Sequence, residues 1–266
     1  MKLPAHKKTR RKRRRHTQLQ LRVLRGRGGP GRGQGRKKRK HDYVPHTRRP
    51  FLDKRHPVHI STRLVGGLPS LRGHKLWAAV RKGFVFGRTF VDDELEREVF
   101  RIIHFSVQGR HIHLICEAVD RRALSRGIQA FKVRVAKAIN KALGGRRGTV
   151  FADRYHERII TNPTQCRHAM AYVLLNSRRH AADEGASYPR NRVDPFSSAL
   201  WFNGWTVQRV RPWANAPPTK TDGEVPVAQP RSWLLRTGWK RGSRGGLLSP
   251  NFIPGLPAGA PPLPVW

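Results

Sequence analysis

The sequence predicts an α+β fold, in which an antiparallel sheet carries helices mainly on one face. Two observations lead to this prediction. Globular patterning is confined to about residues 57–180, and the elements there run strand, helix, hairpin, helix, strand-like segment, helix. We expect three parts: a disordered basic arm over residues 1–56, a folded domain over 57–200, and an irregular extension rich in Trp, Pro and Arg over 201–266.

The first half of the domain is predicted from alternation and helical spacing. Residues 57–64 alternate apolar and polar side chains, which is typical of a strand. Residues 70–84 carry apolar side chains at helical spacing, with Ser70 as the expected cap. Two further apolar runs, 100–107 and 111–117, flank a short turn that contains Gly109, which predicts a hairpin.

The second half is predicted to be mainly helical. Asp120 is placed to cap a long amphipathic helix that ends at Gly144-Gly145. A mixed segment, 149–161, precedes Asn162-Pro163, a cap followed by the residue best suited to a first helical position. We expect that last helix to end around Arg179.

Charge and composition limit the classes of function. The chain has 55 Lys and Arg against 16 Asp and Glu, a net charge of +39, so a polyanion such as nucleic acid is the expected partner. Dense basic runs, Lys7–Arg15 and Arg36–Lys40, lie in the predicted arm. There is no apolar run of membrane-spanning length and no apolar signal stretch at the amino end. Cys116 and Cys166 are expected to be reduced thiols, and we expect a cytoplasmic, nucleoid-associated protein.

A pair of histidines is the first candidate for chemistry. His111 and His113 lie in the second hairpin strand, where alternation places both on one face, about 6.5 Å apart along the strand. Two imidazoles at that spacing can chelate one divalent cation. The pattern also suits two surface histidines with no ligand.

Tyr155 is the second candidate. It lies in the segment Ala152–Ile160, between Arg154 and His156. A phenol ionises near pH 10, so a nucleophilic tyrosine needs a nearby cation or basic residues that favour the phenolate. The alternative is that Tyr155 only packs against the domain.

The order and spacing of these residues resemble a known family. The chain has His111-Ile112-His113, a long amphipathic helix, the segment Gly148–His156, and a helix that reads Tyr172-Val173-Leu174-Leu175-Asn176; Asp194–Ser198 follows. This pattern is similar to that of the single-tyrosine HUH transposases, and in particular the REP-associated tyrosine transposases. It covers about residues 57–200.

The resemblance implies a ferredoxin-like sheet and a metal-assisted transesterification on single-stranded or hairpin DNA. It assigns Tyr155 as the nucleophile that forms a 5′-phosphotyrosine, and His111 and His113 as ligands of Mg²⁺ or Mn²⁺. It also implies a homodimer. Relatives supply a third ligand three or four residues after the tyrosine, but Arg158 and Ile159 stand there, so Glu157 or His156 is the expected substitute.

Basic and aromatic residues around these motifs suit a path for DNA. The arginines expected to contact phosphates are Arg121, Arg122, Arg126, Arg154, Arg158, Arg178 and Arg179. The tryptophans of the carboxy-terminal part either stack on bases or anchor the extension, and we expect anchoring. Two other functions stay open: a domesticated, non-catalytic DNA-binding protein of the same fold, and an RNA-associated basic protein.

Overall fold

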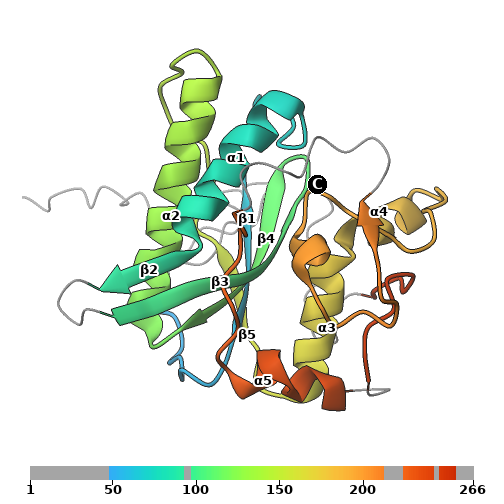
Figure 1. The fold of residues 1–266 in the computed structure, drawn as a ribbon. Coiled ribbons are helices and arrows are strands. Elements are labelled where there is room, and N and C mark those ends of the chain that lie inside the picture. The colour runs from blue at the N-terminus through green and yellow to red at the C-terminus, as the bar shows by residue number, and fades with distance from the viewer. Residues whose placement is uncertain (1–47, 93–96, 213–223, 243–245, 256–266) are drawn as a thin grey trace, which may run out of the picture. The chain divides into compact units, whose positions relative to one another are not determined.

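A computed structural model describes residues 48–92, 97–212, 224–242 and 246–255 (Figure 1). The predicted basic runs of the arm lie outside these residues. The elements, in chain order, are β1 (Val58–Arg63), α1 (His74–Gly87), β2 (Thr89–Asp92), β3 (Arg97–Val107), β4 (His111–Ala118), α2 (Arg121–Ala142), β5 (His156–Ile159), α3 (Pro163–Leu174), α4 (Asn176–Asp183), β6 (Arg192–Val193), η1 (Ser198–Trp201), β7 (Arg211–Pro212), α5 (Trp233–Arg236) and η2 (Gly238–Arg241).

Five strands form one sheet in the order β2-β3-β4-β1-β5, and every neighbouring pair is antiparallel. Without β2, the strands and the first two helices follow a β-α-β-β-α-β order, which is the ferredoxin-like arrangement. The predicted α+β class is therefore confirmed. The strand β2 was not predicted from the sequence, because its four residues are too few to show a period.

The caps explain where the helices begin. Asp120 accepts a hydrogen bond from the backbone amide of Ala123 at 2.7 Å, and Asn162 does the same for Gln165 at 2.9 Å, as predicted. Ser70, in contrast, does not cap α1, whose N-cap is Gly73. The predicted last helix is divided at Leu175 into α3 and α4.

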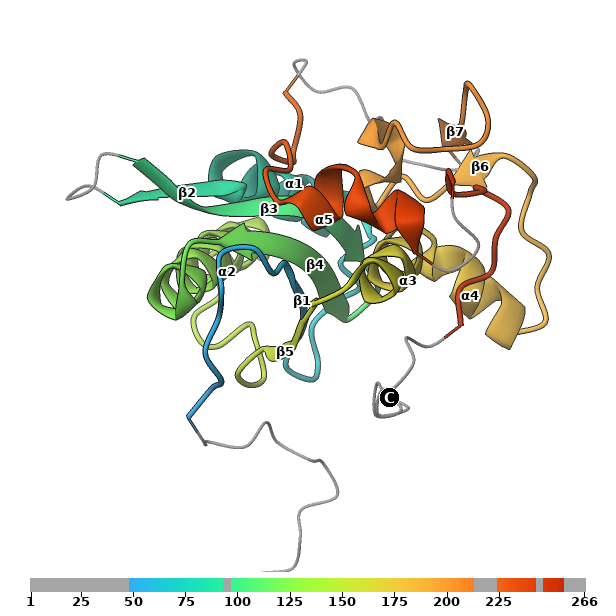
Figure 2. The same ribbon diagram turned by 90° about the horizontal axis from the view of Figure 1, so that it is seen from below.

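Helices cover both faces of the sheet (Figure 2). The helices α1 and α2 pack on one face against Ile60, Phe105 and Leu114. The helix α3 packs on the other face, where Ile103 and Ile115 meet its apolar side. Strand alternation explains the division, because Leu114 and Ile115 are neighbours in β4 and point in opposite directions.

The carboxy-terminal extension is part of this second layer. Trp205 and Trp239 are buried in the same cluster as α3, so the anchoring expected of these tryptophans is confirmed for both. Trp233 differs, with half of its surface exposed. Cys116 and Cys166 are free and buried, and no helix in the described ranges has the length and apolar character to cross a membrane.

Candidate active site

The histidine pair of β4 lies on the sheet face that α3 covers. His111 and His113 point to the same side as Ile115, and the antiparallel partner β1 places Arg63 opposite His111 and Ser61 opposite His113. The ring centroids of the two histidines are 4.9 Å apart. The prediction that they share one face of a stiff strand is thus met by the register of the sheet.

Two further histidines join this pair. The ring of His59, from β1, is 5.4 Å from that of His113, and the ring of His180, from α4, is 6.1 Å from that of His111. Four imidazoles from three elements therefore lie in one cluster. Sequence reasoning missed His59 and His180, because only the β1–β4 register and the position of α4 bring them to the pair.

A tyrosine from α3 completes the cluster. The Tyr172 ring centroid is 5.3 Å from that of His113 and 5.8 Å from that of His59. Asn176, four residues later, starts α4 and is buried. The signal that could have identified Tyr172 was present in the sequence, since Tyr172 and Asn176 form part of the motif on which the resemblance rests.

Tyr155 lies on the opposite face of the sheet. It belongs to the core formed by α1, α2 and the inward side of β4, and its hydroxyl is 3.4 Å from that of Ser125 on α2. The Arg49 guanidinium covers its ring at 3.8 Å. The convergence of Tyr155 with His111 and His113, expected from the sequence, is therefore not found.

The residues expected as third ligands also lie away from the pair. Glu157 accepts from Arg49 at 2.5 Å and from Arg121 at 2.6 Å, and it stands opposite Ile60 on the α2 face. The Glu157 carboxylate is thus paired with two arginine side chains on the face opposite to the histidines. His156 shares the face of His113, since both are paired with Ser61, but it is exposed on the edge strand β5, two strands away from β4.

Burial sets the protonation of the cluster. It lowers the pKa of His59 and of His111 to about 4, and lowers the pKa of His113 well below its usual value, because α3 and α4 exclude water from the rings. These three imidazoles are therefore neutral at pH 7, the form that binds a cation. Burial also raises the pKa of Tyr172, an effect that Asn176 and Arg179 oppose.

The nitrogen atoms of this cluster fit a cation in their chemistry. Both ring nitrogens of His113, Nε2 of His59 and Nε2 of His180 are buried with no hydrogen-bond partner among the described residues. Unpaired buried polar atoms are costly to a fold. Within the described ranges, however, no three His, Cys, Asp or Glu side chains are placed so that together they could hold a metal ion.

The predicted DNA-contacting arginines have different surroundings. Arg178 is buried and donates to the carbonyls of Tyr188, Pro189 and Arg192, which makes it part of the structure. Arg121 is bound to Glu157, and Arg126 lies 3.4 Å from Asp92. The remaining four are exposed or half-buried, namely Arg122, Arg154, Arg158 and Arg179.

Three cations lie around the histidine cluster. Burial is the largest cause of the lowered pKa of His59 and of His111. The charge of Arg158 lowers the pKa of His59 further, and the charge of Arg63 lowers that of His111. Arg179 favours the ionised form of Tyr172. Two of these, Arg158 and Arg179, were predicted from the sequence; Arg63 was not, because only strand pairing places it beside His111.

Comparisons with known proteins found similarity to solved structures. No family model matches the sequence, and no curated protein matches it. A solved structure described as the REP-associated tyrosine transposase bound to a REP hairpin is similar, with 17% sequence identity and a TM-score of 0.43; the likeness covers 71% of this chain and 100% of that one.

Proposed function

We propose that this protein cleaves and rejoins single-stranded or hairpin DNA with Tyr172 as its nucleophile. The observation that carries the proposal is the cluster of Tyr172, His113 and His59, whose rings lie within 6 Å of one another on one face of the sheet. Tyr172 takes the role that the sequence analysis gave to Tyr155. The net charge of +39 supports a polyanionic substrate.

The reaction follows from the chemistry of a phenol. The Tyr172 oxygen attacks the scissile phosphorus, a bond from tyrosine to the 5′-phosphate forms, and the bond to the 3′ oxygen breaks and leaves a 3′-hydroxyl. The phenol proton passes to neutral His59, which with His113 is one of the two imidazoles packed on the Tyr172 ring, and the departing 3′ oxygen takes up a proton in return to become the hydroxyl. The step is reversible because the phosphodiester bond is conserved in the covalent link, so rejoining needs no nucleotide cofactor.

His111 and His113 are the side chains that would hold Mg²⁺ or Mn²⁺. A bound divalent cation would supply polarisation of the phosphate and would favour the phenolate. The third protein ligand we assign is Asn176, because it stands four residues after Tyr172, its buried amide is close enough to act on the Tyr172 hydroxyl, and its amide oxygen is a neutral donor atom. Glu157 is engaged by Arg49 and Arg121 and is not needed for this role.

Positive charge near the cluster would bind the DNA backbone. Arg63, Arg158 and Arg179 act on the cluster from β1, β5 and α4, so they approach it from three sides. Each phosphate contact on a single strand contributes a slope of about −0.7 to the logarithmic salt dependence of binding. A homodimer and a cytoplasmic, nucleoid-associated location stay predictions from the sequence.

The test uses a covalent intermediate. Purified protein is incubated with single-stranded and hairpin DNA and Mn²⁺, then denatured, and the protein–DNA adduct is counted on a gel. We expect an adduct that is lost in Tyr172→Phe and retained in Tyr155→Phe, a matched change of the same residue type on the opposite face. An adduct retained in Tyr172→Phe would refute the assignment.

A non-catalytic DNA-binding protein is the second candidate, and the burial of the cluster favours it. His113 is 1% exposed and Tyr172 is 3% exposed, so a scissile phosphate reaches them only after α3 or α4 moves. This alternative predicts tight, salt-sensitive DNA binding that is unchanged in His111→Ala and in Tyr172→Phe, with no adduct on any DNA.

A further inference from the structure

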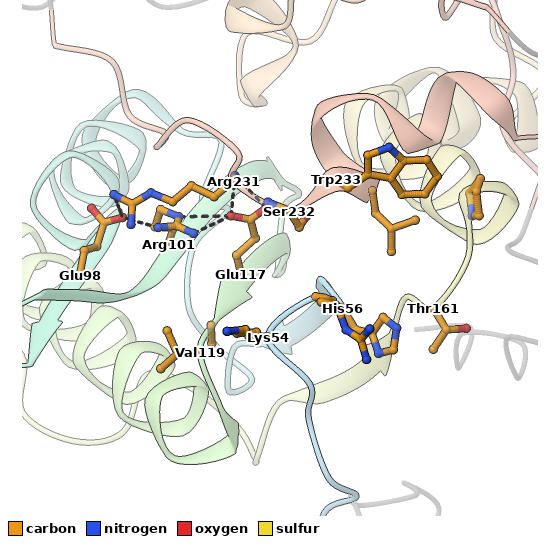
Figure 3. Close-up of a pocket in the computed structure, with 14 residues that line it drawn as sticks. Lys54, His56, Glu98, Arg101, Glu117, Val119, Thr161, Arg231, Ser232 and Trp233 are labelled. Carbon is orange, nitrogen blue, oxygen red and sulfur yellow. Dashed lines mark hydrogen bonds and ion pairs between the residues drawn. The ribbon is translucent and has the colours of Figure 1, made fainter.

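A cavity lies on the sheet face that α3 covers, at the end of β4 that is farther from the histidine cluster. It has a volume of about 610 Å³ and is formed where the end of β4 meets residues 54–56, the start of α3 and the segment 231–234 (Figure 3). Glu117, at its base, shares its face of β4 with His113. Glu117 follows His113 by four positions along the strand, which corresponds to about 13 Å.

The wall of this cavity is fixed by Glu117. Its carboxylate accepts from the backbone amides of Arg231 and Ser232, at 2.9 and 2.8 Å, and from the guanidinium of Arg101 at 2.9 Å. The carboxylate is 3% exposed and its acceptor capacity is used within the protein. Glu117 therefore holds the segment 231–234 in place. Other side chains of the cavity must bind any ligand.

Trp233 is the aromatic residue of this cavity. It is 50% exposed, whereas Trp205 and Trp239 of the same extension are 6% and 2% exposed. Its ring lies directly on Gly238, where an added Cβ would stand 2.7 Å from the indole. The ring is thus supported by the backbone while much of its surface stays in contact with solvent, as a stacking platform for a planar ligand requires.

Basic side chains lie around the same cavity. Arg231 has an exposed side chain, 3.6 Å from Glu98, and Lys54 and His56 stand on the opposite wall (Figure 3). Arg55 is also in the lining but is bound to Asp53 outside it. A base-sized aromatic surface beside the basic side chains of Arg231 and Lys54 is the combination that binds a single nucleic acid strand.

We propose that this cavity binds a flanking segment of single-stranded DNA, with one base stacked on Trp233 and its phosphates on Arg231 and Lys54. The identity of the polymer rests on the proposed function. Because the cavity and the Tyr172 cluster lie at opposite ends of the α3–β4 contact, the bound segment is a few nucleotides from the scissile phosphate.

The experiment measures binding of a fluorescently labelled 20-nucleotide oligo(dT) by anisotropy in EDTA, which separates it from cleavage. We expect Trp233→Ala to weaken binding about tenfold and Trp233→Phe to weaken it less, since a phenyl ring still stacks. Arg231→Ala should weaken binding and reduce the salt slope by about 0.7. Arg236→Ala, which removes an exposed arginine of α5 outside the cavity, is the matched control and should bind as the wild type does.

Unchanged affinity in both Trp233→Ala and Arg231→Ala would overturn the proposal, and the second variant decides the matter if the first does not fold. The result is independent of the catalytic assignment. A protein that forms no adduct but shows the Trp233 dependence would retain this site.

Discussion

The two faces of the sheet bury different kinds of side chain. Towards α2, the inward side is a dry core in which the Phe84 ring stacks on Phe105 at 4.0 Å and packs on Phe131 at 4.9 Å. Towards α3, the same strands present His59, His111 and His113 beside Tyr172. Both faces are buried, yet only the second contains ring nitrogens without a partner among the described residues.

The difference shows where the chain gives up stability. Aromatic and aliphatic contacts on the α2 face contribute favourably, because burying apolar surface stabilises the fold. The unpaired imidazole nitrogens on the α3 face cost free energy, because water that solvated them in the unfolded chain is not replaced. A costly arrangement of this kind is expected at a functional site.

The largest effect on stability is expected from the dry face. Phe131→Ala removes a fully buried ring of α2 that packs against Phe84 of α1, and should lower the free energy of unfolding by about 3–5 kcal/mol. Urea denaturation measures the change. A loss under about 1 kcal/mol would mean that the two faces do not differ in the way described.

The histidine face should respond in the opposite direction. His113→Leu replaces a buried imidazole without partners by an apolar side chain of similar size, so the free energy of unfolding should be unchanged or rise by about 1–3 kcal/mol. Formation of the DNA adduct should be lost in the same variant. Marked destabilisation of His113→Leu would show that the imidazole is satisfied in the fold.

Acid should destabilise the protein through its buried histidines, and His104 offers the cleanest case. Burial lowers its pKa to about 4, against an ordinary value of 6.5, so the folded state disfavours protonation. The stability that neutral His104 contributes is complete above pH 6.5 and is lost as the pH falls towards 4, by about 1.4 kcal/mol per pH unit.

Urea denaturation at a series of pH values, on the wild type and on His104→Gln, isolates this contribution. The variant should lose stability less steeply between pH 6.5 and 4, whatever its stability at pH 7. Equal slopes in the two proteins would contradict the assigned pKa direction.

The smallest effect on stability is expected at Arg179. Its ion pair with Asp183 is i,i+4 on α4 and half exposed, so Arg179→Gln should change the free energy of unfolding by only about 0.3–0.5 kcal/mol. The same change removes a positive charge that favours the Tyr172 phenolate, so the pH profile of adduct formation should move to higher pH. If the pH profile of adduct formation does not move, Arg179 does not act on the Tyr172 phenol.

Local patterns predicted much of this molecule. The shared face of His111 and His113 follows from alternation, and the beginnings of α2 and α3 follow from Asp120 and Asn162, because these signals act over a few residues. The choice between Tyr155 and Tyr172 does not follow from strand alternation or from helical spacing. Tyr155 and Tyr172 are separated by the sheet itself, so the order of the strands and the face on which α3 packs decide which phenol meets the histidines.

The same limit applies to the residues that sequence reasoning missed. His59 and Arg63 reach the cluster through the β1–β4 register, which pairs positions about fifty residues apart. His180 reaches it because the helix divides at Leu175, where no Gly or Pro marks a break. Long-range pairing and an unmarked helix break leave no periodic trace in the sequence.

The central claim is that Tyr172 on the α3 face, and not Tyr155 on the α2 face, attacks DNA. Protein trapped with cleaved DNA is digested with a protease and a nuclease, and the peptide that carries the residual nucleotide is identified by mass spectrometry. We expect the nucleotide on the peptide that contains Tyr172. A nucleotide on the Tyr155 peptide would contradict the account.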